Sequence, residues 1–467
     1  MGREGEVVAE LLTGFRAENP GIQVKVEQLP WSAAHEKLLT AFAGDATPDI
    51  AQLGNTWLPE FVALGALEPL DNFIAGAQGV DSADYFEGIW ATNRIDQRVY
   101  GLPWYVDTRL LFYRRDLLQQ AGYDKPADTW AAWRQQLHAI KRVVGPEKFA
   151  VLLPLNEYDP LVALALQSSQ PDPLLRDGGR YGNFRGPGFR STLDFYLSMY
   201  REQLAPPASS NQIANVWNEF ARGYFSFYIT GPWNIGEFRR RLPAALQSAW
   251  ATAPLPGPLG PGTSVAGGSS LALFNSSKNK PAAWALVSYL SRPAVQQRFR
   301  RLTGNLPPRR SAWADAELQA DPQTQAFRQQ LERVRPVPQV PEWERIATEL
   351  RVLVEQVVHG GIKAQDMPAE MDRRADRMLD KRRWMLDHPR SSLAAPRQVG
   401  LSGTGDRPCG LSPASEGQPA CWPAGQTSGP LQPACCQRPL ALLPSKPPQG
   451  GPEPRQIASA ASAWRLT

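Results

Sequence analysis

Four short segments of this 467-residue chain place a tryptophan beside turn residues and polar side chains. They are Pro30-Trp31, Asn55-Thr56-Trp57, Leu102-Pro103-Trp104-Tyr105-Val106-Asp107 and Gly231-Pro232-Trp233-Asn234. A flat aromatic ring packs against an apolar face of a ligand, while a few placed polar groups bond the rim of that ligand. The pattern favours a site for a sugar, which has C–H groups on one face and hydroxyls around its edge.

Two tryptophans are the leading candidates for ligand contact, because each lies in a Pro- or Gly-bounded loop after a predicted strand. These are Trp104 and Trp233. Asp107 and Arg109 follow Trp104 closely, and their side chains can accept and donate hydrogen bonds to ligand hydroxyls. The tryptophans within or beside predicted helices are interpreted as core residues, namely Trp130, Trp133, Trp217, Trp250 and Trp284.

Motifs of the common enzyme classes are missing from the sequence. It contains no Gly-x-x-x-x-Gly-Lys-Ser/Thr loop, no Gly-x-Gly-x-x-Gly after a strand and no His-Glu-x-x-His. We therefore expect no catalytic residue, no cofactor and no metal site. A glycosidase stays open as an alternative, since it needs only two carboxylates, and Asp107 and Glu237 are the nearest pair by context.

Composition narrows the classes further. The formal net charge is only +5 and no run of 18 apolar residues occurs, so neither nucleic acid nor a membrane span is expected. The basic runs at 239–241 and 381–383 are interpreted as solvated helix faces. All four cysteines lie beyond residue 400, which excludes thiol catalysis and thiolate metal sites from the first 390 residues.

The N-terminal elements follow the order helix, strand, helix, strand. Apolar residues recur at helical spacing from Val7 to Phe15, and Asn19-Pro20-Gly21 ends that helix. A strand is predicted at 22–26, a helix at about 33–42 and a second strand at 49–53. This order with short connections predicts a parallel α/β sheet.

The later elements are predicted from the same signals. Strands are expected within 99–115, at 224–229 and at 271–274, and helices at about 130–143, 160–168, 186–204, 211–222, 280–291 and 293–302. Residues 251–270 are rich in Pro, Gly and Ser and are predicted to form a long loop. A strongly helical stretch follows from Pro341 to about His388.

Motifs of one family are spread in order over most of residues 1–390. They include Asn19-Pro20-Gly21-Ile22, Pro48-Asp49-Ile50, Gly65-Ala66-Leu67-Glu68-Pro69-Leu70-Asp71, Tyr100-Gly101-Leu102-Pro103-Trp104, Phe112-Tyr113-Arg114-Arg115-Asp116-Leu117, Gly231-Pro232-Trp233, Gly267-Gly268 and Gly304-Asn305-Leu306-Pro307. With this order and spacing the chain resembles the solute-binding proteins of ABC sugar importers, the family of maltose- and trehalose-type binding proteins.

The resemblance implies an α/β fold of the two-lobe periplasmic-binding-protein type (type II-like). Each lobe would be a sheet flanked by helices, with the ligand cleft between the lobes. It implies a protein without catalysis that binds a sugar, by analogy an α-linked glucose disaccharide, and delivers it to ABC transporter permease subunits. A monomer in the periplasm, or anchored outside the membrane, is expected, with no nucleic-acid partner. A binding protein for another polar solute, such as a polyol, glycerophosphodiester or oligopeptide, is the alternative.

The resemblance also implies which residues line the cleft. Trp233 would be the stacking ring. The full expected set is Trp31, Asn55, Thr56, Trp57, Trp104, Tyr105, Asp107, Arg109, Trp233, Asn234, Gly267, Gly268 and Arg309.

The resemblance divides the chain into parts. Residues 1–105 are expected to be mainly the N-terminal lobe, 106–250 mainly the C-terminal lobe, 251–315 crossover segments with N-lobe elements, and 316–390 C-terminal helices. Family members carry a leading strand and an export signal, which are missing before Gly5. We hypothesise that the recorded start is internal to the true reading frame.

The last part of the chain, 391–467, is expected to be a disordered Pro/Gly-rich tail. This tail matches nothing in the family, and its composition indicates a frameshift or a mis-set stop. Its tryptophans, Trp422 and Trp464, are expected to have no role.

Overall fold

A computed structural model describes residues 4–76, 79–213, 215–388 and 460–466. All of these belong to one compact unit, formed by Met1–His388 and Ile457–Thr467. A second unit, Pro389–Gln456, lies outside the described residues, and with it the four cysteines, Trp422 and most of the predicted tail. None of the described helices combines the length and the apolar character needed to cross a membrane.

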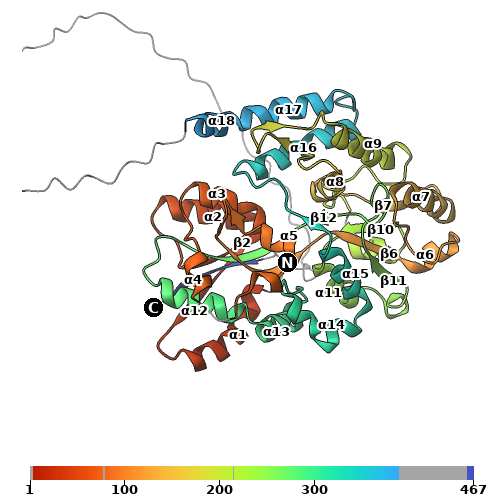
Figure 1. Cartoon of the computed structure of the whole chain (residues 1–467). Coiled ribbons are helices and arrows are strands. Elements are labelled where there is room, and N and C mark those ends of the chain that lie inside the picture. Colours follow the sequence, from red (N-terminus) through yellow and green to blue (C-terminus); the bar gives the residue numbers. More distant parts are fainter. Residues whose placement is uncertain (1–3, 77–78, 214, 389–459, 467) are drawn as a thin grey trace, which may run out of the picture. The chain divides into compact units, whose positions relative to one another are not determined.

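The first lobe is built on a five-stranded sheet with helices on both faces (Figure 1). The strand order is β1 (Val24–Pro30), β15 (Ala460–Leu466), β2 (Ile50–Gly54), β13 (Gly267–Leu273) and β5 (Leu102–Asp107). One face packs on α1 (Glu4–Glu18), α12 (Lys280–Leu290) and α13 (Pro293–Thr303), and the other on α2 (Trp31–Ala43) and α3 (Leu58–Ala63). The predicted order of the first four elements is confirmed.

The prediction of a parallel sheet is wrong for the neighbouring strands of this lobe. β1 and β2 run in the same direction, but β15 lies between them and is antiparallel to both. β13 is likewise antiparallel to β2 and to β5. The local pattern predicts only the helix and strand order, and strands from distant segments then insert between the local ones.

The second lobe is built on a four-stranded sheet, in the order β11 (Trp250–Ala253), β6 (Leu110–Arg114), β10 (Phe225–Thr230) and β7 (Phe149–Leu152). One core contains α7 (Trp130–Val144), α8 (Asp159–Ala165), α9 (Pro187–Arg201), α16 (Trp343–Val358) and α17 (Met367–Met378). The core on the other face contains α10 (Val216–Ala221), α11 (Trp233–Arg241), α14 (Ala316–Ala320) and α15 (Pro322–Leu331). The two-lobe α/β architecture expected from the sequence is confirmed.

Shorter elements complete the described chain. They are α4 (Asp71–Ala75), α5 (Glu87–Ala91), α6 (Arg115–Gln120), α18 (Asp380–Asp387), β3 (Arg94–Ile95), β4 (Arg98–Val99), β8 (Leu175–Arg176) and β9 (Tyr181–Gly182).

The chain crosses between the lobes at short extended segments. Thr108 and Arg109 connect β5 of the first lobe to β6 of the second. Further along, β12 (Ser264–Val265) pairs in parallel with β14 (Val334–Arg335), and only Ala266 separates β12 from β13. The predicted loop at 251–270 is therefore wrong at both ends, because 251–253 belong to β11 of the second-lobe sheet and 264–270 form β12 and the start of β13.

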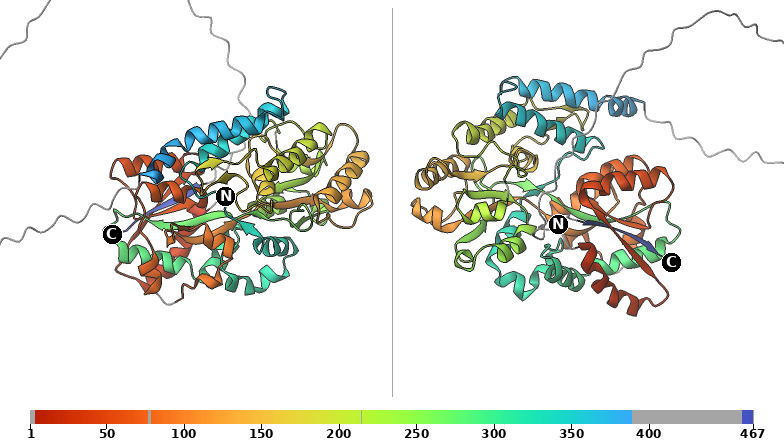
Figure 2. Two further views of the ribbon diagram at one scale, coloured as in Figure 1. Left: turned by 45° about the horizontal axis from the view of Figure 1, so that its top comes forward. Right: turned by 180° about the vertical axis from the view of Figure 1, so that it is seen from behind.

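The expectation for the end of the chain is also corrected, because residues 460–466 form a buried strand. Trp464 is fully buried, although no role was expected for it. Figure 2 shows this dark blue strand inside the first lobe. The core interpretation holds for the helix-associated tryptophans, since Trp130, Trp133 and Trp250 are buried and Trp217 and Trp284 pack at the core margins.

Candidate ligand-binding site

A cavity of about 230 Å³ opens between the two lobes. The first lobe contributes Trp31, Gly54, Asn55, Thr56 and Trp57; the second contributes Tyr158, Asp159, Val337 and Glu344; the crossing strands contribute Tyr105, Asp107, Arg109, Val265, Ala266, Gly267 and Gly268. The sequence predicted most of the first and third groups and none of the second.

The ends of two strands position the aromatic wall of this cavity. β1 ends at Pro30, so Trp31 is the first residue of α2, and β2 ends at Gly54, so Trp57 closes the short 3-10 turn η1 (Asn55–Trp57). Because β1 and β2 run in the same direction, both loops emerge at one edge of the sheet. The two indole rings meet edge to face, with centroids 4.8 Å apart and an interplanar angle of 71°.

Two buried polar atoms of this wall have no hydrogen-bond partner among the described residues. They are Nε1 of Trp31 and Oδ1 of Asn55. The amide of Asn55 is held in place, because its Nδ2 donates to Oγ1 of Thr92 at 2.8 Å. An unpaired buried donor or acceptor costs roughly 1–3 kcal/mol, and both atoms belong to residues that line the cavity.

The floor of the cavity is charged. Arg109 donates from Nη1 to Oδ1 of Asp107, and both side chains are more than nine-tenths buried. Nη2 of Arg109 also lies 3.2 Å from Oδ1 of Asp159 on the second lobe. The guanidinium thus lies at the crossing point with carboxylates from both lobes around it, and its carbon lies 4.7 Å from the ring centroid of Trp233.

The carboxyl groups near Arg109 have raised pKa values. Burial raises the pKa of Asp107, although the charge of Arg109 acts in the opposite direction. Burial also raises the pKa of Glu157 to about 7, and the nearby charges of Asp159 and Asp107 add to the increase. The pKa of Arg109 lies above its ordinary value, since the effect of the surrounding carboxylates outweighs that of burial. The floor therefore carries no surplus of positive charge.

Glu344, at the start of α16, places a carboxylate of the second lobe in the cavity. Glu344 and Thr56 of the first lobe both line the cavity. The carboxylate of Glu344 accepts from the hydroxyl of Tyr158 on the second lobe at 3.3 Å. Burial raises the pKa of Glu344. This carboxylate adds a hydrogen-bond acceptor to the lining of the cavity.

Two glycines allow the crossing strands to approach each other. A Cβ at Gly267 would overlap the carbonyl oxygen of Asp107, and a Cβ at Gly268 would overlap that of Tyr105. Gly268 also has a φ of +141°, which L side chains rarely adopt. These positions therefore require glycine to keep β13 against β5 at the floor of the cavity.

Trp104, Arg309 and Asn234, which the sequence assigned to the site, are not among the residues that line this cavity. Trp104 is 1% exposed and stacks on Phe299 of α13 with centroids 4.4 Å apart, so its ring belongs to the first-lobe core. Nε of Arg309 donates to Oδ2 of Asp84 at 2.6 Å in a separate buried ion pair.

The side chain of Asn234 is used within the second lobe. It accepts from Nε1 of Trp217 at 3.0 Å and donates to Oγ1 of Thr230 at 2.7 Å. Its neighbour Trp233 lies against Arg109 and is not among the residues that line the cavity. Trp233 is half-buried beside the charged floor, and its role as the stacking ring stays a prediction.

The proposed glycosidase pair does not share the cavity. Asp107 lies on the floor, whereas Glu237 lies on α11 in ion pairs with Arg240 and Arg241, the second at 2.6 Å. These arginines lower the pKa of Glu237 against the opposing effect of burial, which is unlike a general acid.

The second-lobe residues of the cavity were not predicted from the sequence, although one segment of them could have been found from its pattern. Asn156-Glu157-Tyr158-Asp159-Pro160 follows strand β7 and combines an aromatic ring with carboxylates, which is the pattern that singled out the tryptophan loops. Glu344 had no such signal, because it opens a long helix whose apolar positions belong to the second-lobe core.

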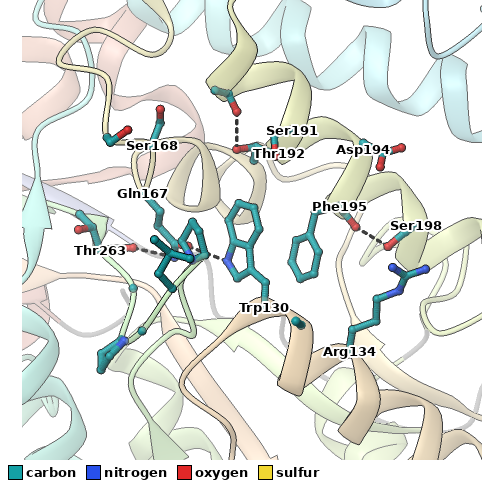
Figure 3. Close-up of a pocket in the computed structure, with 18 of the residues that line it drawn as sticks. Trp130, Arg134, Gln167, Ser168, Ser191, Thr192, Asp194, Phe195, Ser198 and Thr263 are labelled. Carbon is teal, nitrogen blue, oxygen red and sulfur yellow. Dashed lines mark hydrogen bonds between the residues drawn. The ribbon is translucent and has the colours of Figure 1, made fainter.

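A larger hollow, of about 740 Å³, lies on the second lobe between α7, α9 and the loop at 258–263 (Figure 3). Its aromatic residues are already engaged with each other. Trp130 stacks on Phe195 with centroids 4.4 Å apart, and its Nε1 donates to Oε1 of Gln167 at 2.7 Å. The facing sides of the Trp130 and Phe195 rings cover each other, so a ligand cannot stack between them. The interlobe cavity, which is lined by residues of both lobes, is therefore the better candidate site.

Comparison with known proteins agrees with this geometry. The family described as "Bacterial extracellular solute-binding protein" matches residues 2–297. This chain belongs to that family. The resemblance inferred from the sequence is confirmed.

Several sugar-binding proteins are similar to this chain over most of its length. A solved structure of the sugar-binding protein MalE from Xanthomonas citri is 53% identical, covers 83% of this chain and 98% of its own, and superposes with a TM-score of 0.80. The maltotriose-binding protein of Pyrococcus abyssi is 23% identical over 77% of each chain. The diacetylchitobiose binding protein DasA of Streptomyces coelicolor is 22% identical over 72% of this chain and 78% of its own.

Proposed function

We propose that this protein binds a neutral sugar of mono- or disaccharide size in the interlobe cavity and delivers it to an ABC-type permease for import. The carrying observation is the cavity itself, which is lined by aromatic residues of the first lobe, carboxylates of the second lobe and the Asp107–Arg109 pair between them. Its volume of about 230 Å³ lies just below the usual range of small-molecule pockets, which begins near 300 Å³. The 53% identity to a sugar-binding protein supports the same ligand class.

Each part of the cavity has a role toward such a ligand. The rings of Trp31 and Trp57 pack on the apolar face of the sugar, and Nε1 of Trp31 donates to a hydroxyl. The carboxylates of Asp107, Asp159 and Glu344 accept from hydroxyls on the opposite rim. A site built from buried polar groups rejects an analogue that lacks the matching hydroxyl, because those groups are then left unpaired.

Local charge favours a neutral sugar over a glycerophosphodiester. The one arginine of the cavity lining is already paired with Asp107 and lies 3.2 Å from Asp159. Glu344 adds a further carboxylate to the lining. A phosphate would enter a site without free positive charge, whereas hydroxyls would find acceptors.

The crossing strands and the cavity lining, which comes from both lobes, support a transport role. A ligand that touches both lobes favours the closed arrangement of those lobes, and the closed arrangement is what a permease would recognise. We propose a periplasmic or externally anchored monomer without catalysis and without a nucleic-acid partner, as is expected for a member of this extracellular family.

A thermal-shift panel tests this function. We expect a neutral disaccharide, such as maltose or trehalose, to raise the unfolding temperature, while glycerophosphocholine and mannitol do not. A ligand at 100 times its dissociation constant stabilises by about 2.7 kcal/mol. A shift with glycerophosphocholine alone would move the assignment to that solute, and hydrolysis of any disaccharide during incubation would contradict a purely binding role.

A further inference from the structure

The strand at the end of the described chain occupies an internal position of the first-lobe sheet. β15 pairs with β1 along its whole length, from Val24 opposite Leu466 to Pro30 opposite Ala460. On its other side it pairs with β2, where Ala463 lies opposite Ala51 and Trp464 opposite Ile50. Within the described residues, β1 has no strand neighbour other than β15.

The side chains of β15 fit different spaces on the two faces of the sheet. Trp464 and Leu466 enter the core on the side of α1, where Trp464 meets Trp104 edge to face with centroids 5.7 Å apart. Ala463 enters the core on the side of α2. The slot therefore takes large apolar side chains on one face and a small one on the other.

Polar groups fix the end of the strand. The amide of Leu466 donates to Oδ2 of Asp49 at 2.7 Å, and its carbonyl accepts from Nδ2 of Asn279 at 2.9 Å. The guanidinium of Arg465 donates to the carbonyl oxygen of Ala46 at 2.8 Å. These bonds come from two separate loops, 44–49 before β2 and 274–279 before α12, so they define both the register and the direction of the occupant.

Removal of β15 would leave two unpaired strand edges in the middle of a lobe. Adjacent strands lie about 4.8 Å apart, so β1 and β2 would face each other across the width of one missing strand. Unpaired edges bind extended peptides through the backbone, and alternate side-chain pockets then select among those peptides.

We propose that the first lobe contains a strand-accepting slot between β1 and β2. The slot binds an antiparallel strand with large apolar residues at the positions of Trp464 and Leu466 and a small residue at the position of Ala463, and Ala460–Leu466 is the occupant in this chain. Because the occupant is held by pairing and packing, a separate peptide of the same sequence fills the slot once the attached strand is removed or cut.

The slot has a second consequence, which rests on the proposed function. The aromatic wall of the cavity is carried by the loops that follow β1 and β2, and β15 is the strand between them. The occupant therefore sets the distance between Trp31 and Trp57, and it acts on the sugar site by positioning these rings.

The test uses a variant that ends at Gln456 and a fluorescent peptide of residues 457–467. We expect the labelled peptide to bind the shortened variant saturably and to raise its unfolding temperature. It should bind the full chain, whose slot is filled, far more weakly. The same peptide with Trp464→Asp is the matched control, and burying the charge should weaken binding by about tenfold or more.

Three outcomes would overturn the proposal. One is a shortened variant with the unfolding temperature of the full chain, and another is equal affinity of the two peptides for that variant. If the variant does not fold, a protease site is placed within residues 389–456 of the full chain and cleaved after folding. In that experiment, the third contradicting outcome is that the labelled peptide fails to displace the cleaved strand. Peptide binding is read without sugar, so it remains informative if the proposed function fails.

Discussion

Replacing Trp57 by alanine tests the aromatic wall of the cavity most specifically. Trp57 lines the cavity on η1 and meets Trp31 edge to face at 4.8 Å. A tryptophan buries about 150–250 Å² in a contact. If roughly 60 Å² of that area faces the sugar, its loss removes about 1.5 kcal/mol of binding free energy at 25 cal/mol per Å².

The substitution also removes the partner that orients Trp31. An aromatic pair contributes about 0.5–1.5 kcal/mol beyond its buried area. The two effects together amount to about 2–3 kcal/mol, which corresponds to a roughly 30- to 150-fold weaker dissociation constant. Trp57→Phe retains a ring of smaller area, so it should lose only part of this affinity.

Calorimetric titration with the disaccharide that performs best in the thermal-shift panel measures this loss. Trp384→Ala is the matched control, because this indole is 62% exposed on α18 and lies outside the cavity. The control should bind like the unaltered protein. If Trp57→Ala keeps its unfolding temperature and binds the sugar with unchanged affinity, the assignment of the aromatic wall is refuted.

Three further predictions concern the floor of the cavity. Asp107→Asn removes the buried charge that pairs with Arg109, so the binding free energy of the sugar should weaken by about 1.5–3 kcal/mol in calorimetry. Asp387→Asn is the control, because Asp387 forms an exposed ion pair with Arg180, and this variant should bind the sugar normally. Burial raises the pKa of Glu157 from 4.5 to about 7, so the protonated form is favoured on folding. The contribution of protonated Glu157 to the free energy of unfolding is complete below pH 4.5 and is lost as the pH rises through 7, by up to about 3 kcal/mol. Glu157→Gln should flatten the dependence of urea unfolding on pH between 4.5 and 7. An unchanged dependence would contradict the raised pKa of Glu157. Gly267→Ala should lower stability by about 1–3 kcal/mol, because its Cβ overlaps the carbonyl of Asp107, while Gly236→Ala, with open space around it, should not be destabilised.

The sequence predicted the parts of the site that lie on local loops. Trp31, Asn55, Trp57, Asp107 and Arg109 each stand beside a turn or a strand end, and all five line the cavity. Their loop context was visible within a few residues, so local patterns were sufficient. Their contact with ligand stays a prediction.

Trp104 shows where local patterns fail. Every residue of β5 is buried, so the strand has no polar alternation that would show which side chains face the cleft. Phe299, which covers the ring of Trp104, lies almost two hundred residues further along the chain. The distinction between a core ring and a cleft ring therefore depended on a distant helix.

The same limit applies to the end of the chain. The composition of residues 391–467 is low in apolar density, and the tail was therefore expected to be without structure. One short run, from Ala460 to Leu466, nevertheless pairs with strands more than four hundred residues away. An average over a long segment conceals a seven-residue strand.

Calorimetric titration of the unaltered protein with a neutral disaccharide is the most direct test of the central claim. We predict saturable heat with one site per chain, and none with glycerophosphocholine under the same conditions. The absence of heat and of any thermal shift with every sugar tested, or the same affinity in the Trp57→Ala and Asp107→Asn variants, would contradict sugar binding in the interlobe cavity.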